Sequence, residues 1–370
     1  MTERIQTVAL IGTGLIGGSL GLALRARRPD LQVVAYDPRV GQAAVERGVA
    51  HASASTLGAA VEDADLIVLG APVRLLPRLL DGLGPHLKQG ALVTDVGSVK
   101  APLVAHAAKV LPPPHLFVGG HPMAGAERGG IAHADAFLFE NATWVLCPPH
   151  GKTEAEVPQR FPVLIDLVEA TGARVLVLEA ARHDRIAALV SHVPQLVAVL
   201  LMTLAAESNQ DDDAFLRLAA GGFRDMTRIA SSPFDLWRDI LVANEGPVLD
   251  ALARLADMLQ STRYDLAGAH LDALAQRFDR ARTVRNTIPK DTKGFLAPLA
   301  DVYVYAEDRP GFLLRLVQTL YDGGLNIKDV ELLKIREGTG GAFRFGFASD
   351  TDADQAVAAL TAATYTAYRL

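Results

Sequence analysis

The stretch "TVALIGTGLIGGSLG", residues 7–21, decides the fold of this chain. A short apolar run leads directly into glycines with the spacing G-x-G-x-x-G, and a helical pattern follows. Such glycines let a strand turn tightly into a helix whose N-terminal N–H groups face an anion. The stretch predicts a nucleotide-binding Rossmann unit, the alternative being a purely structural turn. The residues that we expect at the pyrophosphate are Gly12, Gly14, Leu15, Ile16 and Gly17.

The next apolar run, "LQVVAYD" at residues 31–37, ends in a carboxylate that supports this interpretation. Asp37 lies twenty residues beyond Gly17, where an acidic side chain hydrogen-bonds the ribose hydroxyls of a dinucleotide. Because a carboxylate repels a 2′-phosphate, NAD is the favoured cofactor. Arg39 close by leaves NADP open.

The pattern along the chain predicts an α/β protein with three domains and one linker. Apolar runs alternate with helical stretches over residues 1–150, as in a parallel sheet covered on both faces by helices. Helical spacing dominates residues 151–285, and the polar residues 286–298 are typical of a linker. Residues 299–370 predict a βαββαβ unit. The clearest strands of the first domain are residues 7–12, 31–37, 65–72, 91–98 and 141–148.

Composition limits the class of protein. The 370 residues suffice for two or three domains, and the net charge of −6 argues against a nucleic-acid binder. The single cysteine, Cys147, excludes an internal disulfide, and a cytoplasmic location is expected. Residues 186–206 are long and apolar enough to span a membrane, but His192, Pro194 and Gln195 would be costly in lipid. We therefore expect a helix buried in a protein core and no membrane partner.

The stretch "FVGGHPMAGAERGG", residues 117–130, places a histidine where chemistry is expected. Proline after His121 favours extended backbone, so an extended loop is predicted to present the imidazole. Ser98 follows the apolar run before it, and both residues are expected at the carboxyl edge of the sheet, where ligands bind. A neutral imidazole suits the removal of a hydroxyl proton during hydride transfer. The alternative is a surface histidine in a glycine-rich turn.

Five motifs together resemble the prephenate dehydrogenase family over about residues 5–290: "GTGLIGGS", "TDVGSVK", "GGHPMAGAE", "SHVPQL" and "GGFRDMTRIA". The resemblance implies that His121 removes the ring-hydroxyl proton of prephenate. Hydride then passes to NAD and carbon dioxide leaves, which gives 4-hydroxyphenylpyruvate. It also implies that Ser98 supports His121 and the hydroxyl, and that Glu127 helps to close the pocket.

The two carboxylates of prephenate require cationic partners. Arg224 and Arg228 lie four residues apart and are expected on one helix face, where guanidinium groups bind carboxylates in pairs of hydrogen bonds. The resemblance favours Arg228 most strongly. The alternative for Arg224 is a solvated position paired with Asp225, and Trp237 is either near the substrate or a core anchor.

Polar residues interrupt the apolar helix at Ser191, His192 and Gln195, and such groups need partners or a ligand. Relatives commonly carry a second histidine where this chain has Gln195, so arogenate, with an amino group in place of the keto group, is an alternative substrate. His192 is either a substrate contact or a core histidine. No metal site is expected: His183 and His192, nine residues apart, are placed on opposite helix faces.

The last 70 residues resemble an ACT domain through "DRPGFL" and "GGLNI". The resemblance implies a tyrosine effector bound near Asp308, Gly311 and Asn326, the alternative being a packing module without ligand. The apolar helical region also predicts a homodimer. Two other functions are alternatives: an amino-acid sensor without enzymatic activity, and a β-hydroxyacid dehydrogenase with Lys100 as the catalytic group.

Overall fold

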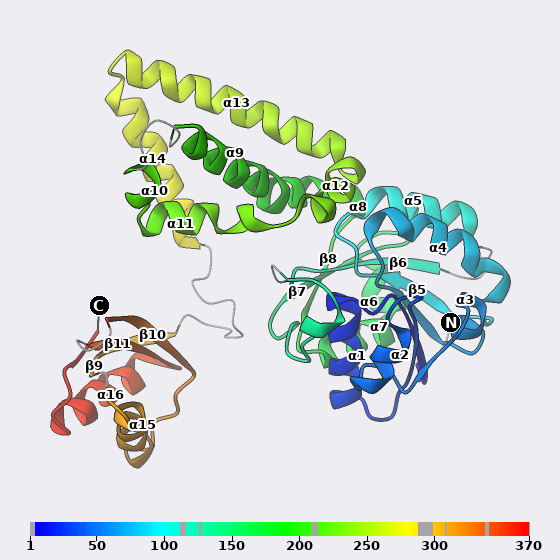
Figure 1. Ribbon diagram of the computed structural model, residues 1–370, viewed down its shortest axis with the longest axis horizontal. Helices are drawn as coiled ribbons and strands as arrows, with labels where there is room; N and C mark the ends of the chain where they lie inside the picture. Colours follow the sequence, from blue (N-terminus) through cyan, green and yellow to red (C-terminus); the bar gives the residue numbers. More distant parts are fainter. Residues whose placement is uncertain are drawn as a thin grey trace. The chain divides into compact units, whose positions relative to one another are not determined.

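A computed structural model describes residues 4–111, 116–125, 128–208, 214–287, 299–307, 309–336 and 340–369. The chain divides into two compact units, Met1–Ala275 and Gln276–Leu370. The first contains the nucleotide-binding sheet and most of the helical region (Figure 1). The second contains a small four-stranded sheet with two helices.

The large sheet of the first unit has eight strands in the order β3-β2-β1-β4-β5-β6-β7-β8. The strands from β3 to β6 along this order run parallel, which confirms the expected Rossmann arrangement. All five of the strands expected from the sequence are present. The strands are β1 Thr7–Ile11, β2 Gln32–Tyr36, β3 Ala52–Ser53, β4 Leu66–Leu69, β5 Leu92–Asp95, β6 Leu116–Pro122, β7 Thr143–Cys147 and β8 Arg174–Val177.

Two features of this sheet differ from the expectation. His121 lies within β6 rather than in a loop, because β7 pairs antiparallel with β6 and matches Val145 to His121. The sheet also continues beyond residue 150, because β8 pairs parallel with β7. The boundary expected at residue 150 is therefore too early, and the sheet ends at Val177.

Helices cover both faces of the sheet (Figure 1). On one face α1 packs through Leu20 and Leu24, and α7 through Leu164 and Leu167. On the other face the apolar side chains of α3, α4 and α5 form a second cluster. Because both faces are covered, the strands carry almost uninterrupted apolar residues. The helices are α1 Leu15–Arg27, α2 Gly41–Glu46, α3 Leu57–Val61, α4 Leu76–Leu83, α5 Ala101–Val110, α6 Glu156–Arg160 and α7 Pro162–Ala170.

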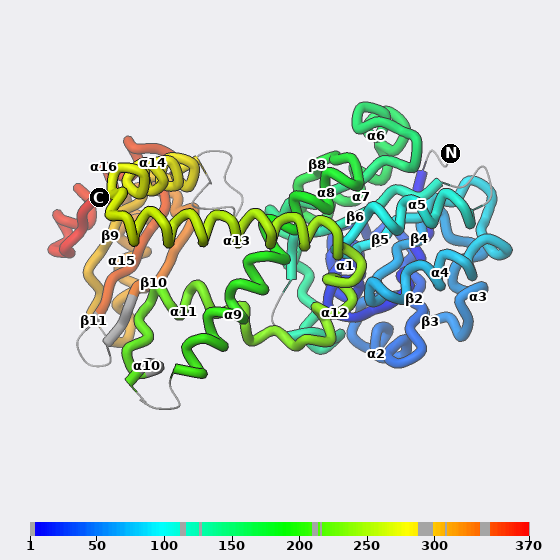
Figure 2. The backbone as a smooth tube through the Cα atoms, turned by 90° about the horizontal axis from the view of Figure 1, so that it is seen from above, coloured from blue at the N-terminus to red at the C-terminus, as the bar shows by residue number. Residues whose placement is uncertain are grey.

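The helical region begins with one long helix, in which the π-helical turn Ala188–His192 joins α8 to α9. Helix α13 runs alongside α9 (Figure 2). The sequence 247–282 is helical as expected, apart from a break near Ala269, whose φ is +51°. The helices are α8 Ala180–Ala187, α9 Val193–Ser208, α10 Ala214–Arg217, α11 Gly221–Thr227, α12 Phe234–Ala243, α13 Glu245–Ala267 and α14 Leu271–Thr287. Residues 288–298 of the expected linker lie outside the described residues.

The helix Ala180–Ser208 is, by length and composition, apolar enough to cross a membrane, and only 33% of its most apolar window is buried within the chain. The expectation of a helix buried in the core is therefore wrong for most of its length. Neighbouring elements of the chain cover only part of its apolar side chains. The exposed ones include Leu189, Val190, Val199, Leu200 and Leu204.

The second unit has the expected order β9-α15-β10-β11-α16-β12, and its sheet order is β10-β11-β9-β12 with antiparallel pairing throughout. Its core is formed by Val302, Val304, Phe345 and Phe347 from the strands and by Leu316 from α15. The alternation of these residues produces one buried face per strand, and the fold is ACT-like. The elements are β9 Ala300–Ala306, α15 Phe312–Asp322, β10 Asp329–Arg336, β11 Gly340–Phe347, α16 Asp350–Ala362 and β12 Ala367–Tyr368.

Candidate active site

The loop from β1 to α1 has the geometry of a phosphate cradle. Gly12 has a φ of +98°, and a Cβ there would lie 2.7 Å from the backbone carbon of Gly70. A Cβ on Gly17 would collide with the carbonyl oxygen of Gly12. At Gly14, in contrast, no described atom lies within 4 Å of the Cβ position. Gly12 and Gly17 thus close the turn, whereas the Gly14 backbone faces open space in which a phosphate fits.

Two further observations fit a bound dinucleotide. The Thr13 hydroxyl is buried and has no hydrogen-bond partner among the described residues, so it offers a polar group toward the cradle. Helix α1 begins at Leu15 and Ile16 without a side-chain cap, which leaves its first N–H groups for an anion. The Asp37 carboxylate accepts N–H bonds from Thr13 at 3.0 Å and Arg39 at 2.9 Å. Asp37 therefore joins the end of β2 to the cradle.

The two glycines provide a matched test of the cradle. Gly14 has ordinary extended dihedral angles, φ −68° and ψ −153°. We therefore expect Gly14→Ala to leave the thermal unfolding midpoint unchanged and to weaken NAD binding at least about tenfold, because the methyl group occupies phosphate space. Gly17→Ala is expected to lower both the midpoint and the affinity, since its methyl group meets Gly12. Calorimetric NAD titration and thermal unfolding measure the two effects. Unchanged NAD affinity in Gly14→Ala would contradict this cradle.

His121 is held at the carboxyl end of the sheet by a buried charged cluster. Asp95, the last residue of β5, accepts the Gly120 N–H at 2.9 Å and pairs with the Lys100 ammonium. Lys100 also donates to the Gly120 carbonyl at 2.7 Å. Both charged side chains are fully buried, and burial raises the pKa of Asp95 against the attraction of Lys100. This cluster fixes both backbone groups of the residue before His121.

The His121 imidazole contacts a second histidine. Its Nδ1 lies 2.8 Å from His183 Nε2, and the two rings meet edge to face with centroids 5.0 Å apart. Burial lowers the pKa of His121 well below its usual range, and the nearby His183, Lys100 and His192 act in the same direction. His121 is therefore a neutral base at neutral pH. Ser98 lies half-buried three residues beyond Asp95, just after the neighbouring strand.

A π-helical turn, Ala188–His192, lies between His183 and His192, and both side chains are buried. Both histidines are near enough to His121 to lower its pKa. Asn244 Nδ2 donates to the Asp184 carbonyl at 2.9 Å and lies 3.1 Å from His192 Nδ1. Burial lowers the pKa of His192 to about 4, so its ring is neutral and accepts this bond.

The remaining residues expected at the substrate are distributed over the helical region. Ser191 is half-buried in the π turn, and the Trp237 ring meets His192 edge to face at 6.0 Å. The Trp237 indole N–H is buried and has no hydrogen-bond partner within the described part of the chain. Glu127 lies outside the described residues.

Gln195 lies on α9, and the two arginines lie on α11 and on the 3-10 turn that follows it. The Gln195 amide is buried and donates to the Ile229 carbonyl at 2.9 Å, so it ties α9 to the turn that carries Arg228. Helix α11 ends at Thr227, and Arg228 begins a 3-10 turn. Arg224 and Arg228 thus lie on either side of the junction between the two helix types. Both side chains are exposed.

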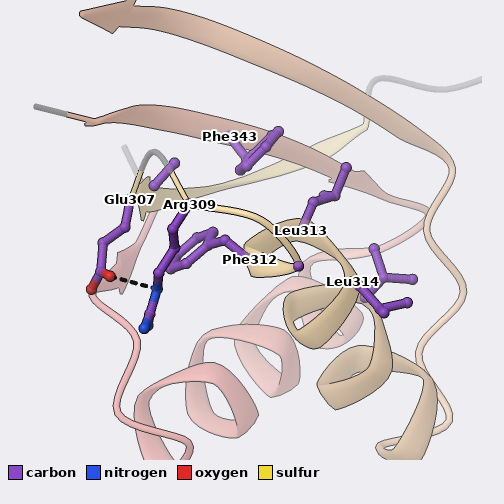
Figure 3. A pocket seen from close by; sticks show the side chains of 9 residues that line it. Glu307, Arg309, Phe312, Leu313, Leu314 and Phe343 are labelled. Atoms are coloured by element: carbon purple, nitrogen blue, oxygen red, sulfur yellow. Dashed lines mark ion pairs between the residues drawn. The ribbon is translucent and has the colours of Figure 1, made fainter. Parts of the chain in front are cut away.

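The ACT-like unit has a cavity of about 520 Å³ beside the start of α15 (Figure 3). Gly311, with a φ of +76°, lines it together with Phe312, Leu313 and Phe343. Its polar rim is the ion pair of Arg309 with Glu307, whose atoms are 2.7 Å apart. Asn326 is exposed and not among the lining residues, and Asp308 lies outside the described residues.

Several residues of the site escaped the sequence analysis. Gly70, whose Cβ would collide with the Gly12 carbonyl oxygen 2.6 Å away, has no motif of its own. Asp95 and Asn244 are single polar residues next to apolar runs, and only their burial identifies them. The adjacent pair His183 and Asp184 was a usable signal, since two ionisable residues on a helix face with apolar neighbours require partners.

Comparisons with known proteins agree with this geometry. Residues 20–177 match the family model for the prephenate dehydrogenase nucleotide-binding domain, and residues 179–280 match the model for the prephenate dehydrogenase dimerization domain. Prephenate dehydrogenase of Bacillus subtilis is 33% identical over 96% of this chain and 96% of its own length.

Two solved structures are similar over the first unit. Prephenate dehydrogenase of A. aeolicus, in complex with hydroxyphenyl propionate and NAD+, has a TM-score of 0.70 at 29% identity and covers 78% of this chain and 100% of its own. Synechocystis arogenate dehydrogenase has a TM-score of 0.66 at 29% identity and covers 76% of this chain and 99% of its own. With the NAD cradle and the half-buried imidazole at the sheet edge, these matches lead to one conclusion. The chain belongs to the prephenate dehydrogenase family of NAD-dependent oxidoreductases.

Proposed function

We propose that this chain catalyses the NAD-dependent oxidative decarboxylation of prephenate to 4-hydroxyphenylpyruvate in tyrosine biosynthesis. The observation that carries the proposal is the neutral imidazole of His121, held at the carboxyl end of the sheet whose first strand leads into the NAD cradle. In open parallel sheets this edge is where cofactor and substrate meet. The family membership agrees with this reaction.

The reaction requires the protein to orient the substrate against NAD and to provide one general base. When bound, NAD supplies the acceptor for the hydride that leaves the carbon bearing the ring hydroxyl. His121 accepts the hydroxyl proton as the C–O bond becomes a carbonyl. The ring carboxylate then leaves as carbon dioxide, the electrons of the broken C–C bond make the ring aromatic, and the ring oxygen takes the proton back from His121. Ser98, next to the strand of His121, orients the hydroxyl in this proposal.

The substrate carboxylates are assigned to the helical region. Arg228 binds one of them, Arg224 and Ser191 assist, and Trp237 and His192 line the pocket with their rings in contact. Glu127 closes the pocket in this proposal. The Gln195 amide N–H donates to the Ile229 carbonyl. In this proposal Gln195 therefore positions the turn that carries Arg228. Loss of one guanidinium–carboxylate contact costs about 2–4 kcal/mol at a desolvated site.

Prephenate and arogenate are therefore to be compared as substrates under identical conditions, with NADH absorbance as the readout. We expect prephenate to be the better substrate, and Arg228→Ala to raise its KM by about a hundredfold with a smaller change in kcat. The control is Arg78→Ala, which changes an exposed arginine on α4. Faster turnover of arogenate would contradict prephenate as the substrate. It would support arogenate, in line with the similarity to an arogenate dehydrogenase.

The helical region is proposed to join two copies of the chain. Its exposed apolar residues lie on α9 and α13, and they include Val199, Leu200, Leu204 and Leu259. An apolar surface of this kind is typical of a subunit interface, and the matching family model describes a dimerization domain. We expect a dimer by light scattering at micromolar concentration, and a monomer would contradict this assignment.

The ACT-like unit is proposed to bind tyrosine as an inhibitor in the cavity beside Gly311. Phe312 and Phe343 line it for a ring, and the Arg309–Glu307 pair provides opposite charges for an amino acid. Inhibition requires that tyrosine binds one conformational state better than another. Prephenate turnover that tyrosine leaves unchanged would contradict the proposal.

We also propose a cytoplasmic location, because the single cysteine, Cys147, forms no disulfide within the chain.

A further inference from the structure

We propose that His183 is a positioning residue that fixes the tautomer of His121, through a hydrogen-bonded chain from Asp184 through His183 to His121. The chain consists of two contacts of 2.8 Å each: Asp184 Oδ1 to His183 Nδ1, and His183 Nε2 to His121 Nδ1. His183 and Asp184 are each 2% exposed, so water does not compete for these contacts. The inference rests on the proposed function, in which His121 is the base.

The direction of the hydrogen bonds follows from Asp184. Its Oδ1 accepts the backbone N–H of Lys100 and its Oδ2 accepts that of Ala101, both at 2.8 Å. These two N–H groups open helix α5, whose dipole favours a negative charge at this end. The side chain is therefore held as a carboxylate, which only accepts hydrogen bonds.

Each imidazole then has a defined tautomer. Because Asp184 is an acceptor, His183 Nδ1 carries the hydrogen, and its Nε2 carries a lone pair. His121 Nδ1 must donate to that lone pair and so carries the other hydrogen. The remaining nitrogen, His121 Nε2, is left with the lone pair that accepts the hydroxyl proton. In the opposite tautomer Nε2 carries a hydrogen and cannot act as a base.

The same chain stabilises the charge that forms in the reaction. When Nε2 accepts the proton from the hydroxyl oxygen, His121 becomes an imidazolium whose Nδ1–H still donates to His183. The Asp184 carboxylate lies at the other end of His183 and offsets this positive charge. The charged and titratable groups that surround His121 are His183, Lys100 and His192, and all three disfavour the imidazolium. The acids of this cluster are Asp184, at the far end of the hydrogen-bonded chain, and Asp95, which pairs with Lys100.

The test compares His183→Phe with His183→Gln. Phenylalanine keeps the ring volume and removes both nitrogens, and we expect kcat to fall by about 10²–10³, by analogy with the loss of a tautomer-fixing carboxylate in serine proteases. KM for prephenate and NAD affinity are expected to change less than threefold. Glutamine places an amide oxygen near the position of Nε2 and is expected to retain at least a tenth of the wild-type kcat. His106→Gln, at a half-buried histidine paired with Asp81, is the control and is expected to keep full activity.

A second measurement reads the tautomer directly and needs no turnover. In protein labelled with ¹⁵N-histidine, the His121 signals are identified by their loss in His121→Asn. We expect a protonated Nδ1 and an unprotonated Nε2 in the wild type, and a mixture of tautomers in His183→Phe. A protonated Nε2 in the wild type, or kcat of folded His183→Phe within threefold of wild type, would overturn the proposal. Absence of prephenate turnover in the wild type would instead refute the proposed function.

Discussion

Replacement of His121 by asparagine is expected to lower the kcat for NADH production from prephenate by about a thousandfold or more. General base catalysis by a positioned imidazole contributes about 10²–10⁴, and an amide accepts no proton at neutral pH. The smaller side chain fits β6, and the Asp95–Lys100 cluster still holds Gly120. We therefore expect NAD affinity and the thermal midpoint to remain close to wild type. His133→Gln, at an exposed histidine, is the matched control.

The pH dependence of kcat/KM in the wild-type enzyme tests the role of His121 as the base independently. Only neutral His121 acts as a base, so kcat/KM is lost as the pH falls through the pKa of His121. Because burial and the neighbouring positive groups lower this pKa well below 6.5, we expect constant activity through the neutral range and a loss only at acid pH. An acid limb at pH 7 or above, or activity within tenfold of wild type in His121→Asn, would leave His121 without this role.

The second large effect is expected for Lys100→Met, which breaks the buried ion pair with Asp95. Removing one partner leaves a buried carboxylate without its counter-charge, which costs about 3–5 kcal/mol of unfolding free energy. The change also removes the hydrogen bond to the Gly120 carbonyl, so we expect activity to fall together with stability. Urea unfolding followed by tryptophan fluorescence measures the free energy, since Trp144 is buried in the same sheet.

Two variants make this experiment decisive. In Lys100→Met with Asp95→Asn neither member of the pair carries a charge, so we expect part of the lost stability to return. Lys152→Met breaks the ion pair with Glu156, in which the two side chains are 37% and 32% exposed, and it is expected to cost no more than about 1 kcal/mol. Equal losses for Lys152→Met and Lys100→Met would contradict the role of burial.

The sequence alone predicted the features that depend on residues close to one another in the chain. Glycine spacing and the run of apolar residues predicted the cradle between β1 and α1, because a tight strand-to-helix turn has few sequence solutions. Alternating apolar residues predicted the ACT-like strands. The string around His121 predicted the residue that we propose as the base. The continuation of the sheet to β8 was not predictable in this way, because strand pairing depends on partners distant in sequence.

The tertiary structure alone decided how the polar residues meet. His121 and His183 are 62 positions apart in the chain, and Lys100 reaches Asp184 across 84 positions. The π turn at Ala188–His192 and the 3-10 turn that begins at Arg228 were not predicted from the sequence either. Hydrogen bonds and charge pairs act over a few ångströms in space, and no periodicity in a sequence encodes which distant segments come within that range.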